Sequence, residues 1–294
     1  MSFPTLGIRM NTPLISACDL HAMMAQNAPL LVFDCTFDLV QPEAGRQQYL
    51  EAHIPAAVHA DLNRDLSAKG ASDAASEGRH PLPSREQFAR WLGRMGLANG
   101  MQAVVYDRNG CNFCGRLWWM LRWCGHDAVA VLDGGLAAWL AAGFSLQNGP
   151  EIPKNESNYT LAKVSIAPVA TEVIATNLGS SSQTLIDARA PARYRGEVEP
   201  LDPVAGHIPG ALNRPFMHNF QADGSFKPAA MLRAEFLALL AGRDPASVIH
   251  HCGSGVSALP NLLAMELAGF GTTALYAGSW SAWCSDASRP VARG

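Results

Sequence analysis

Short apolar runs alternate with stretches of helical spacing along most of the chain. In the C-terminal half, three apolar runs are expected to form buried strands: Thr184–Asp187, Ser247–His251 and Thr273–Tyr276. Between them, Met231–Ala241 and Ala258–Ala268 place apolar residues three and four positions apart, which is typical of helices. Strands that alternate with helices predict an α/β domain in which a mostly parallel sheet is flanked by helices.

The N-terminal half shows the same alternation. Ala103–Asp107 and Ala128–Leu132 predict strands, and Arg85–Met95 and Gly115–Cys124 predict helices, the first of them with Ser84 as its N-cap. The same α/β fold class is therefore predicted for this half.

Several motifs recur in both halves in the same order. His53-Ile-Pro-Ala-Ala57 returns 154 residues later as His207-Ile-Pro-Gly-Ala211. An apolar strand, a glycine-rich turn and a tryptophan also occur twice, ending at Trp139 and, 144 residues later, at Trp283. The shorter second spacing means that the first copy carries about ten extra residues between positions 57 and 104. We interpret the chain as a duplicated domain.

The length fits two copies of one ordinary domain. The chain has 294 residues, and the stretch before residue 165 is rich in Pro, Gly, Asn and charged residues, with no apolar period. We therefore predict one domain in residues 1–148, a linker in 149–165 and a second domain in 166–294, with pseudo-twofold symmetry between the domains.

Composition and charge exclude several classes of partner. With 48% hydrophobic and only 16% charged residues, the chain is expected to form packed cores. A net charge of −3 offers no basic field for a phosphate backbone, so no nucleic-acid partner is expected. No apolar run reaches the roughly 18 residues of a membrane span, and no signal peptide is recognised. Seven cysteines, an odd number in a long chain, argue against a disulfide framework, so a cytoplasmic location is expected.

One segment has the residue order of a reactive-cysteine loop. The predicted strand before Cys252 runs into Cys252-Gly-Ser-Gly-Val-Ser-Ala258, after which a helix begins. Gly253 and Gly255 can turn successive backbone N–H groups inward, and the helix N-terminus adds partial positive charge. A cysteine at the mouth of such a loop is expected to be held as the thiolate. The alternative is a buried cysteine at a strand end, with glycines that only allow a tight turn.

Two of the enzyme classes that use such a cysteine are disfavoured by neighbouring positions. Tyrosine and dual-specificity phosphatases need an arginine six residues after the cysteine, where this chain has Ala258. Thioredoxin-like oxidoreductases need Cys-x-x-Cys, and the third position after Cys252 is Gly255. Sulfurtransferases need only the thiolate, the ring of amides and a basic group that holds the donor.

The combination of motifs resembles the tandem-domain rhodanese-type sulfurtransferases over nearly the whole chain. The Cys252 loop is closest to the 3-mercaptopyruvate sulfurtransferase branch, in which it typically reads Cys-Gly-Ser-Gly-Val-Thr-Ala. Thiosulfate-preferring members usually carry an Arg-Lys pair where this chain has Gly253-Ser254. The other motifs that carry the resemblance are both His-Ile-Pro motifs, Val104-Val-Tyr-Asp107, Leu117-Trp-Trp-Met120, Asp133-Gly-Gly135, and Asp187-Ala-Arg189 followed by Arg193-Tyr194.

The resemblance implies two rhodanese-like domains and a reaction at Cys252. Cys252 would attack the thiol sulfur of 3-mercaptopyruvate, release pyruvate and become a persulfide. A thiol acceptor such as thioredoxin or glutathione, or cyanide, would then take the sulfur. Neither a metal nor an organic cofactor is implied. Thiosulfate:cyanide sulfurtransfer, or a non-catalytic role in which Cys252 carries a persulfide for a partner protein, remain alternatives.

The resemblance also implies roles for other residues. Ser254 would bind near the sulfur or relay a proton, and Arg193 would hold the donor carboxylate. In this branch a histidine and an aspartate of the first domain reach toward the cysteine, and here they would be His80 and Asp61, which belong to the part of the first copy that carries the extra residues. The remaining loop positions expected to bind the substrate are Gly253, Gly255, Val256 and Ser257.

The chain departs from the branch at one substrate-binding position. The branch commonly has a second arginine directly after a Glu-Pro pair, but here Leu201 follows Glu199-Pro200. Our hypothesis is that Arg195 partly replaces that arginine, or that Arg193 and the loop amides hold the carboxylate alone.

Several other groups have structural explanations. Asp107-Arg108 stands where the second copy has Cys252, so the first copy is expected to be inactive. Cys111 and Cys114 have redox or metal spacing, but no second ligand pair lies nearby in the sequence. They are either a reversible disulfide or, as the simpler reading, two unlinked thiols. His53 and His207 are expected to be structural, and Arg189 is expected to pair with Asp187.

Overall fold

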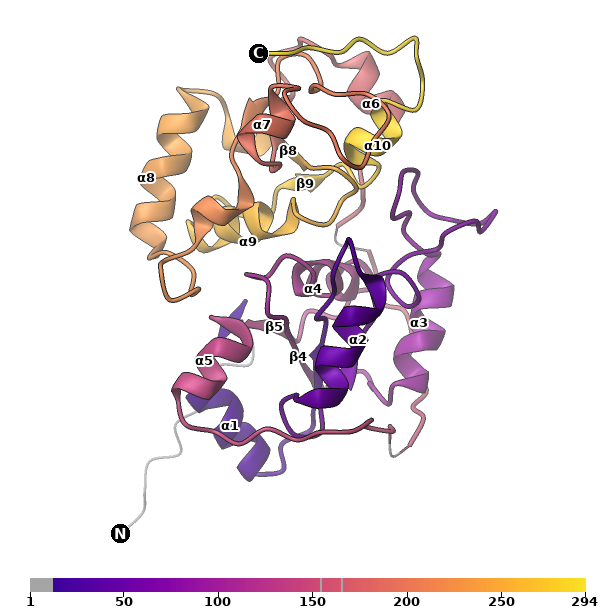
Figure 1. Ribbon diagram of the computed structural model, residues 1–294, viewed down its shortest axis with the longest axis vertical. Coiled ribbons are helices and arrows are strands. Elements are labelled where there is room, and N and C mark those ends of the chain that lie inside the picture. The colour runs from indigo at the N-terminus through magenta and orange to yellow at the C-terminus, as the bar shows by residue number, and fades with distance from the viewer. Residues whose placement is uncertain (1–12, 154, 165) are drawn as a thin grey trace.

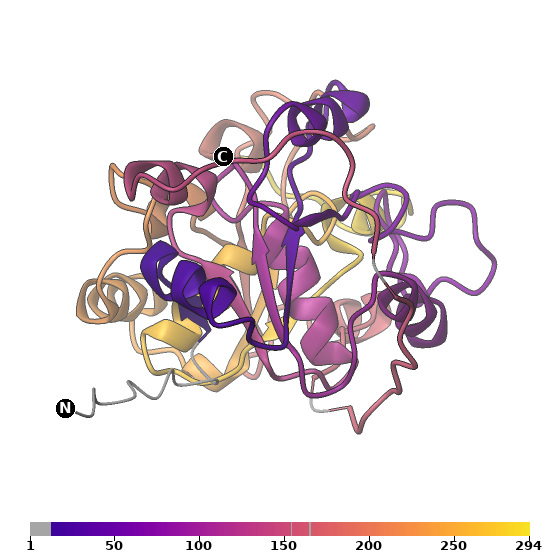
Figure 2. The ribbon, with the colours of Figure 1, turned by 90° about the horizontal axis from the view of Figure 1, so that it is seen from below.

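The computed structural model describes residues 13–153, 155–164 and 166–294, and it forms two stacked domains (Figure 1). The first domain holds a five-stranded parallel sheet in the order β1-β5-β4-β2-β3. Its strands are β1 (Leu14–Ile15), β2 (Leu30–Asp34), β3 (Val58–His59), β4 (Gln102–Tyr106) and β5 (Val129–Leu132). Its helices are α1 (Ala17–Ala25), α2 (Pro42–Glu51), α3 (Arg85–Arg94), α4 (Cys114–Trp123) and α5 (Gly135–Ala141). Figure 2 shows the strands in the middle with helices on both sides.

The second domain repeats the arrangement with a four-stranded parallel sheet, in the order β7-β6-β8-β9. Its strands are β6 (Thr184–Asp187), β7 (Leu212–Asn213), β8 (Val248–His251) and β9 (Ala274–Leu275). Its helices are α6 (Thr171–Thr176), α7 (Pro191–Tyr194), α8 (Ala229–Leu240), α9 (Leu259–Leu267) and α10 (Ser279–Trp283), with 3-10 turns η1 (Phe216–Asn219) and η2 (Pro245–Ser247). The predicted α/β class is confirmed in both halves.

The strands and helices predicted from periodicity are present, with shifts of a few residues at their ends. Ser84 is the N-cap of α3, and its Oγ accepts a hydrogen bond from the Gln87 N–H at 3.3 Å. The strand expected over Thr273–Tyr276 is only two residues long, Ala274–Leu275. It lies at the end of the strand order, where it pairs with β8 and forms one isolated bridge with Pro168.

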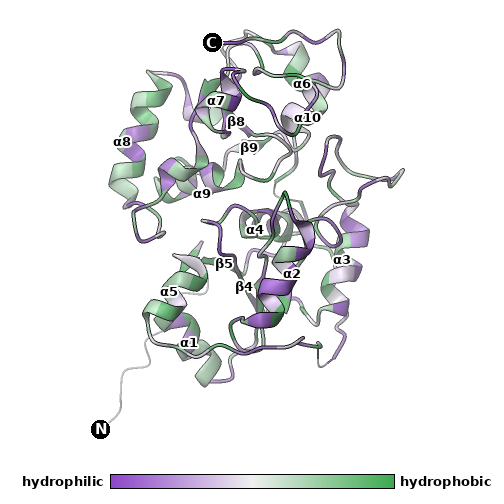
Figure 3. Cartoon of the chain, in the orientation of Figure 1, coloured by the Kyte–Doolittle hydropathy of each residue, from purple (hydrophilic) through white to green (hydrophobic). Residues whose placement is uncertain are grey.

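Burial along the central elements follows from their place between layers. All five residues of β4 are buried, as expected for a parallel strand covered on both faces. Every residue of α4 except Arg122 is also buried, because α4 packs on its own sheet and against α9 of the second domain (Figure 1). The outer helices α2 and α3 instead carry hydrophilic bands (Figure 3). Helices α4 and α9 therefore form the main helix–helix packing contact between the two domains.

The two His-Ile-Pro turns are built in the same way. His53 Nδ1 lies 2.8 Å from the carbonyl oxygen of Tyr49, and His207 Nδ1 lies 2.8 Å from that of Tyr194. Each imidazole also stacks on the tyrosine that it bonds. The shared geometry supports a structural role for both histidines, as expected from their presence in both copies.

The segment between α5 and α6 lies along the first domain. The Ser157 N–H donates to the Gly93 carbonyl at 2.8 Å, the Ala162 N–H donates to the Cys124 carbonyl at 3.1 Å, and Tyr159 is buried. The linker is therefore held against α3 and α4, while the domain limits at residues 148 and 166 stay predictions. Within the described ranges, no helix is both long and apolar enough to cross a membrane.

Candidate active site

Cys252 follows the last residue of β8, and its backbone is fixed on both sides. Its N–H donates to Ser279 Oγ at 3.1 Å, and its carbonyl accepts the Trp280 N–H at 3.0 Å. The residue is almost completely buried, with 2% of its surface exposed. The loop of residues 252–258, the Cys252 loop, thus starts from a fixed point at the carboxyl end of the sheet.

The loop turns its amides toward the sulfur. Gly255 has a φ of +71°, and a Cβ there would lie 2.3 Å from the carbonyl oxygen of Ala277, so glycine is required. This turn lets the Val256 N–H donate to Cys252 Sγ at 3.3 Å. The predicted ring of loop amides therefore has one N–H on the sulfur.

The first domain carries the same loop with an anion built into it. In residues 107–113, the Asp107 loop, Gly110 has a φ of +66° and matches Gly255, while Asp107 matches Cys252. The Asp107 carboxylate accepts four backbone N–H groups at 2.8–3.0 Å, from Asn109, Cys111, Phe113 and Cys114. This loop conformation is therefore suited to an anion at its first residue, and the second copy offers that place to a sulfur.

His80 reaches the Cys252 loop from the other domain. Its Nδ1 lies 2.7 Å from Ser254 Oγ, and the Arg79 N–H donates to Ser281 Oγ at 3.0 Å, which fixes this part of the chain near α10 (Figure 1). Burial lowers the pKa of His80 to about 3, and the nearby charges of Lys69, Arg116 and Arg79 act in the same direction. The imidazole beside Ser254 is therefore neutral at physiological pH.

Two arginines from different domains meet beside the loop. A Cβ at Gly253 would lie 3.0 Å from Arg79 Nη2 and 3.5 Å from Arg193 Nη2, so both guanidinium groups face the same backbone. Asp202 pairs with both arginines, and Glu199 pairs with Arg193 at 2.6 Å. The arrangement presents two cations next to Cys252, each oriented by a carboxylate.

Other predicted site residues lie differently. The Asp61 carboxylate accepts the N–H groups of Asn63 and Arg64 at 2.8 and 2.9 Å, and among the described residues its hydrogen bonds do not include His80. The Arg195 side chain is 43% exposed and pairs with Glu197 at 2.6 Å, so it does not join the two arginines at the loop. Ser257 is partly buried on the loop, and Arg189 pairs with Asp187 at 2.6 Å, as expected.

Arg116 is a functional candidate that sequence reasoning missed. It lies in the first turn of α4 and is completely buried. Its guanidinium donates to the carbonyls of Gly255 at 3.0 Å, His80 at 2.9 Å and Leu66 at 3.3 Å. Burial lowers the pKa of Arg116 to about 10 and the charge of Cys252 opposes this, so the group stays protonated at neutral pH. The available signal was an arginine in the first turn of a helix whose other residues, apart from Arg122, are uncharged.

Ser279 is a second residue that was missed. Its φ of +54° suits glycine, and its counterpart in the first domain is Gly135, with a φ of +56°. Its hydroxyl accepts the Cys252 N–H and donates to the Tyr276 carbonyl at 2.9 Å. The serine that replaces a glycine in the repeat is therefore tied to the backbone of Cys252.

No metal site is found in the part of the chain that the structure describes. No group of three or more His, Cys, Asp or Glu side chains there could hold an ion. The seven cysteines, including Cys111 and Cys114, are all present as free thiols.

Comparison with known proteins gives a consistent result. The Rhodanese-like domain family matches residues 16–142 and 170–286. A probable 3-mercaptopyruvate sulfurtransferase of Pseudomonas aeruginosa is 46% identical over 96% of this chain and 98% of its own length. A putative thiosulfate sulfurtransferase, SseB, of Mycobacterium tuberculosis is 38% identical over 96% of this chain and 97% of its own. The crystal structure of the 3-mercaptopyruvate enzyme SseA from Escherichia coli has a TM-score of 0.78 and 31% identity, covering 92% of this chain and 99% of that one.

The buried neutral histidine predicts a loss of stability in mild acid. The unfolded chain binds a proton at His80 below its ordinary pKa of 6.5, whereas the folded chain does so only near pH 3. The contribution of neutral His80 to the free energy of unfolding is therefore fully present above pH 6.5 and is lost as the pH falls toward 3. The loss is about 2 kcal/mol at pH 5. Urea unfolding between pH 7 and 5 should show a shallower pH dependence for His80→Gln than for the wild type, and equal slopes would contradict the assignment.

Two substitutions of Ser279 separate its hydroxyl from its backbone strain. Ser279→Gly keeps the favoured φ and removes only the hydrogen bonds, so kcat for sulfur transfer should fall about fivefold, with KM nearly unchanged. Ser279→Ala should lose the same kcat and also lower the thermal midpoint, because alanine retains the strained φ without the bonds that compensate it. Full activity in Ser279→Gly would show that the hydroxyl does not position Cys252.

Proposed function

The chain belongs to the family of rhodanese-like sulfurtransferases, and we propose that it moves the sulfur of 3-mercaptopyruvate through a persulfide on Cys252 to a thiol or cyanide, releasing pyruvate. One observation carries the choice of donor: Arg79 and Arg193 meet beside the amides of the Cys252 loop. A 2-oxo acid with a thiol on its third carbon needs a carboxylate site and a sulfur site a few ångströms apart.

Arg79 supplies the positive charge that the branch has at the position of Leu201. The branch places its second arginine at the position of Leu201, and in this chain the backbone around Leu201 instead lies next to Arg79, whose Nη1 bonds Asp202. A carboxylate of the donor would exchange with Asp202 and Glu199 for the two guanidinium groups. Such charge-assisted pairs give both affinity and orientation.

In the first half-reaction the Cys252 thiolate attacks the thiol sulfur of the donor. The carbon–sulfur bond breaks, its electron pair passes to the methylene carbon, and the enolate of pyruvate forms as Cys252 becomes a persulfide. The enolate needs one proton at carbon. Ser254 is hydrogen-bonded to the neutral His80 and can relay this proton to the carbon. Both groups are uncharged before the proton moves.

In the second half-reaction an acceptor thiolate or cyanide attacks the outer sulfur of the persulfide. The sulfur–sulfur bond breaks and Cys252 returns to a thiolate, which the loop amides and the charge of Arg116 stabilise. The anion that leaves is the same one that begins the cycle, so the loop serves both halves.

Thiosulfate remains a second candidate donor. Leu201 stands where the mercaptopyruvate branch has an arginine, and the relative from Mycobacterium tuberculosis is named a putative thiosulfate sulfurtransferase. The Gly253-Ser254 pair and the position of Arg79 favour mercaptopyruvate.

Steady-state rates with the two donors test the proposal. We expect kcat/KM for 3-mercaptopyruvate to exceed that for thiosulfate by about tenfold or more, since one additional charged pair contributes that much. Cys252→Ser should abolish turnover with both, and mass spectrometry of the wild type after donor addition should find one extra sulfur on Cys252. Full turnover by Cys252→Ser would exclude the mechanism, and equal or better rates with thiosulfate would exclude the donor. A sulfur gained only from a protein donor would favour the carrier role.

A pair of arginine variants tests which residue completes the carboxylate site. Arg79→Gln should raise KM for 3-mercaptopyruvate by about tenfold or more, because it removes a charged pair in a half-buried site. Arg195→Gln is the matched control, and its KM should change less than twofold because the side chain is exposed and bonded to Glu197. A larger rise in KM for Arg195→Gln than for Arg79→Gln would contradict this assignment and identify Arg195 as the second carboxylate ligand.

A further inference from the structure

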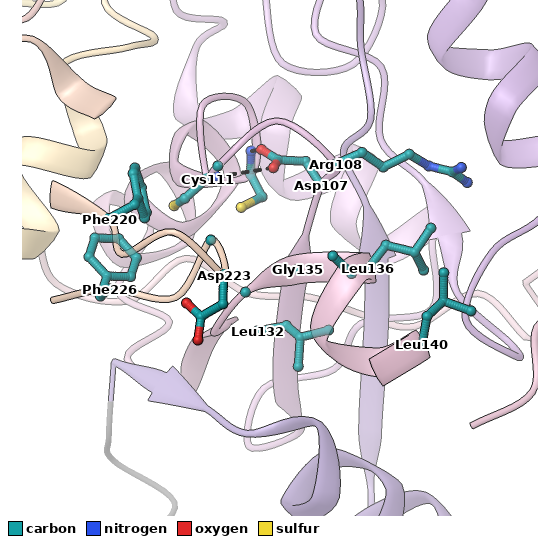
Figure 4. A pocket seen from close by; sticks show the side chains of 15 residues that line it. Asp107, Arg108, Cys111, Leu132, Gly135, Leu136, Leu140, Phe220, Asp223 and Phe226 are labelled. Carbon is teal, nitrogen blue, oxygen red and sulfur yellow. Dashed lines mark hydrogen bonds between the residues drawn. The ribbon is translucent and has the colours of Figure 1, made fainter. Parts of the chain in front are cut away.

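The Asp107 loop opens onto a pocket of about 300 Å³ between the two domains. Phe220 and Phe226 of the second domain line one side, and Leu136 and Leu140 of α5 line the other (Figure 4). Cys111 and Cys114 also line the pocket. Because Asp107 matches Cys252, this pocket is the counterpart, in the first copy, of the proposed sulfur-transfer site.

The two cysteines are placed for disulfide chemistry. The Cys111 carbonyl accepts the Gly115 N–H at 3.3 Å, which closes one turn and leaves Cys111 and Cys114 next to each other. Both thiols are buried, and Cys111 helps to raise the pKa of the Cys114 thiol. In a single turn of chain, residues three apart have Cα atoms at about the separation that a disulfide requires, so a bond between these two cysteines needs little backbone movement.

A proton acceptor lies beside them. The Asp107 carboxylate accepts the backbone N–H groups of Cys111 and Cys114 at 3.0 and 2.9 Å, and burial raises the pKa of that carboxyl although its backbone hydrogen bonds oppose the shift. Burial, the contact with Cys111 and the charge of Asp107 all raise the pKa of Cys114. Cys114 therefore stays protonated until its proton passes to Asp107.

We propose that Cys111 and Cys114 form a second reactive site, which exchanges disulfide bonds with small cationic disulfides bound in this pocket. The activity goes beyond sulfur transfer at Cys252 and does not use that residue. Charge and size select the ligand class, because the walls are mainly apolar and the side chains of Asp107 and Asp223 are acidic. The Arg108 guanidinium points away and donates to the carbonyls of Gln48 and Ala52 (Figure 4).

The exchange takes two balanced steps. Cys111 loses its proton to water and attacks one sulfur of the bound disulfide as a thiolate, the substrate S–S bond breaks, and the first leaving thiolate takes up a proton from water. Cys114 then passes its proton to Asp107 and attacks the Cys111 sulfur, and the second leaving thiolate takes that proton from Asp107. Two electrons pass from the protein thiols to the substrate, and a Cys111–Cys114 disulfide remains.

The test uses the full chain with Cys18→Ser and Cys252→Ala, so that the exposed thiol and the proposed sulfur-transfer thiol cannot react. Cystamine is the probe, and dithiodiglycolate, a disulfide of similar size and opposite charge, is the comparison. We expect the loss of two thiols and two hydrogens, mapped to the peptide with Cys111 and Cys114, about fivefold faster with cystamine. Dithiothreitol should reverse it.

Further variants in that background separate the two steps. Cys114→Ala should stop after the first step and accumulate a cysteamine adduct on Cys111, whereas Cys111→Ala should leave Cys114 unmodified. Cys35→Ala is the matched control, since this buried thiol lies near the pair but does not line the pocket, and it should change neither the rate nor the product. Adducts on Cys111 and Cys114 separately, a disulfide to Cys35, or no reaction in the folded protein would overturn the proposal. These results do not depend on whether Cys252 transfers sulfur.

Discussion

The buried charge of Arg116 is the constraint around which the two domains are arranged. A guanidinium removed from water is costly unless its donors are bonded and a negative charge is near. Here three carbonyls from three separate segments receive its N–H groups: Leu66, His80 and Gly255. The charge of Cys252 acts on it as well. Domain docking and the positions of His80 and the Cys252 loop thus stabilise one another through a single side chain.

Duplication explains why only one of the two loops leaves its first position open to a sulfur. Both copies keep the strand, the left-handed glycine and the following helix, and this backbone directs N–H groups toward the first residue of each loop. The first copy fills the site with its own Asp107, whereas the second has a cysteine whose sulfur can accept and release an atom. Each loop is also contacted by the opposite domain. Arg79 and His80 of the first domain reach the Cys252 loop. In the second domain, the Phe226 N–H donates to the Asp133 carboxylate beside the Asp107 loop.

Local pattern was enough for the Cys252 loop and for the longer central elements, because these depend on periodicity and on glycine geometry over a few residues. These elements are β4, β5, β6, β8, α3, α4, α8 and α9. The approach of His80 to Ser254 came from family resemblance, since no spacing law links residues so far apart. No pattern in the sequence points to Arg79, although it directly precedes His80, because its direction depends on Asp202 in the other domain. Arg116 was missed for a related reason: an apolar helix does not reveal which carbonyls will surround its one buried cation.

The ion pairs of the two site arginines orient their guanidinium groups more than they stabilise the fold. The arginines are Arg79 and Arg193, and their partners are Asp202 and Glu199. Partly buried ion pairs gain little net free energy over apolar packing, yet removing one partner leaves a charge unpaired. When no donor is bound, Asp202 and Glu199 keep the two arginines paired, and they hold both guanidinium groups against the Cys252 loop. In the proposed reaction, a donor carboxylate that replaced them would meet cations that are already oriented and are supplied by both domains. Recognition of the proposed donor and docking of the domains would then depend on the same interactions.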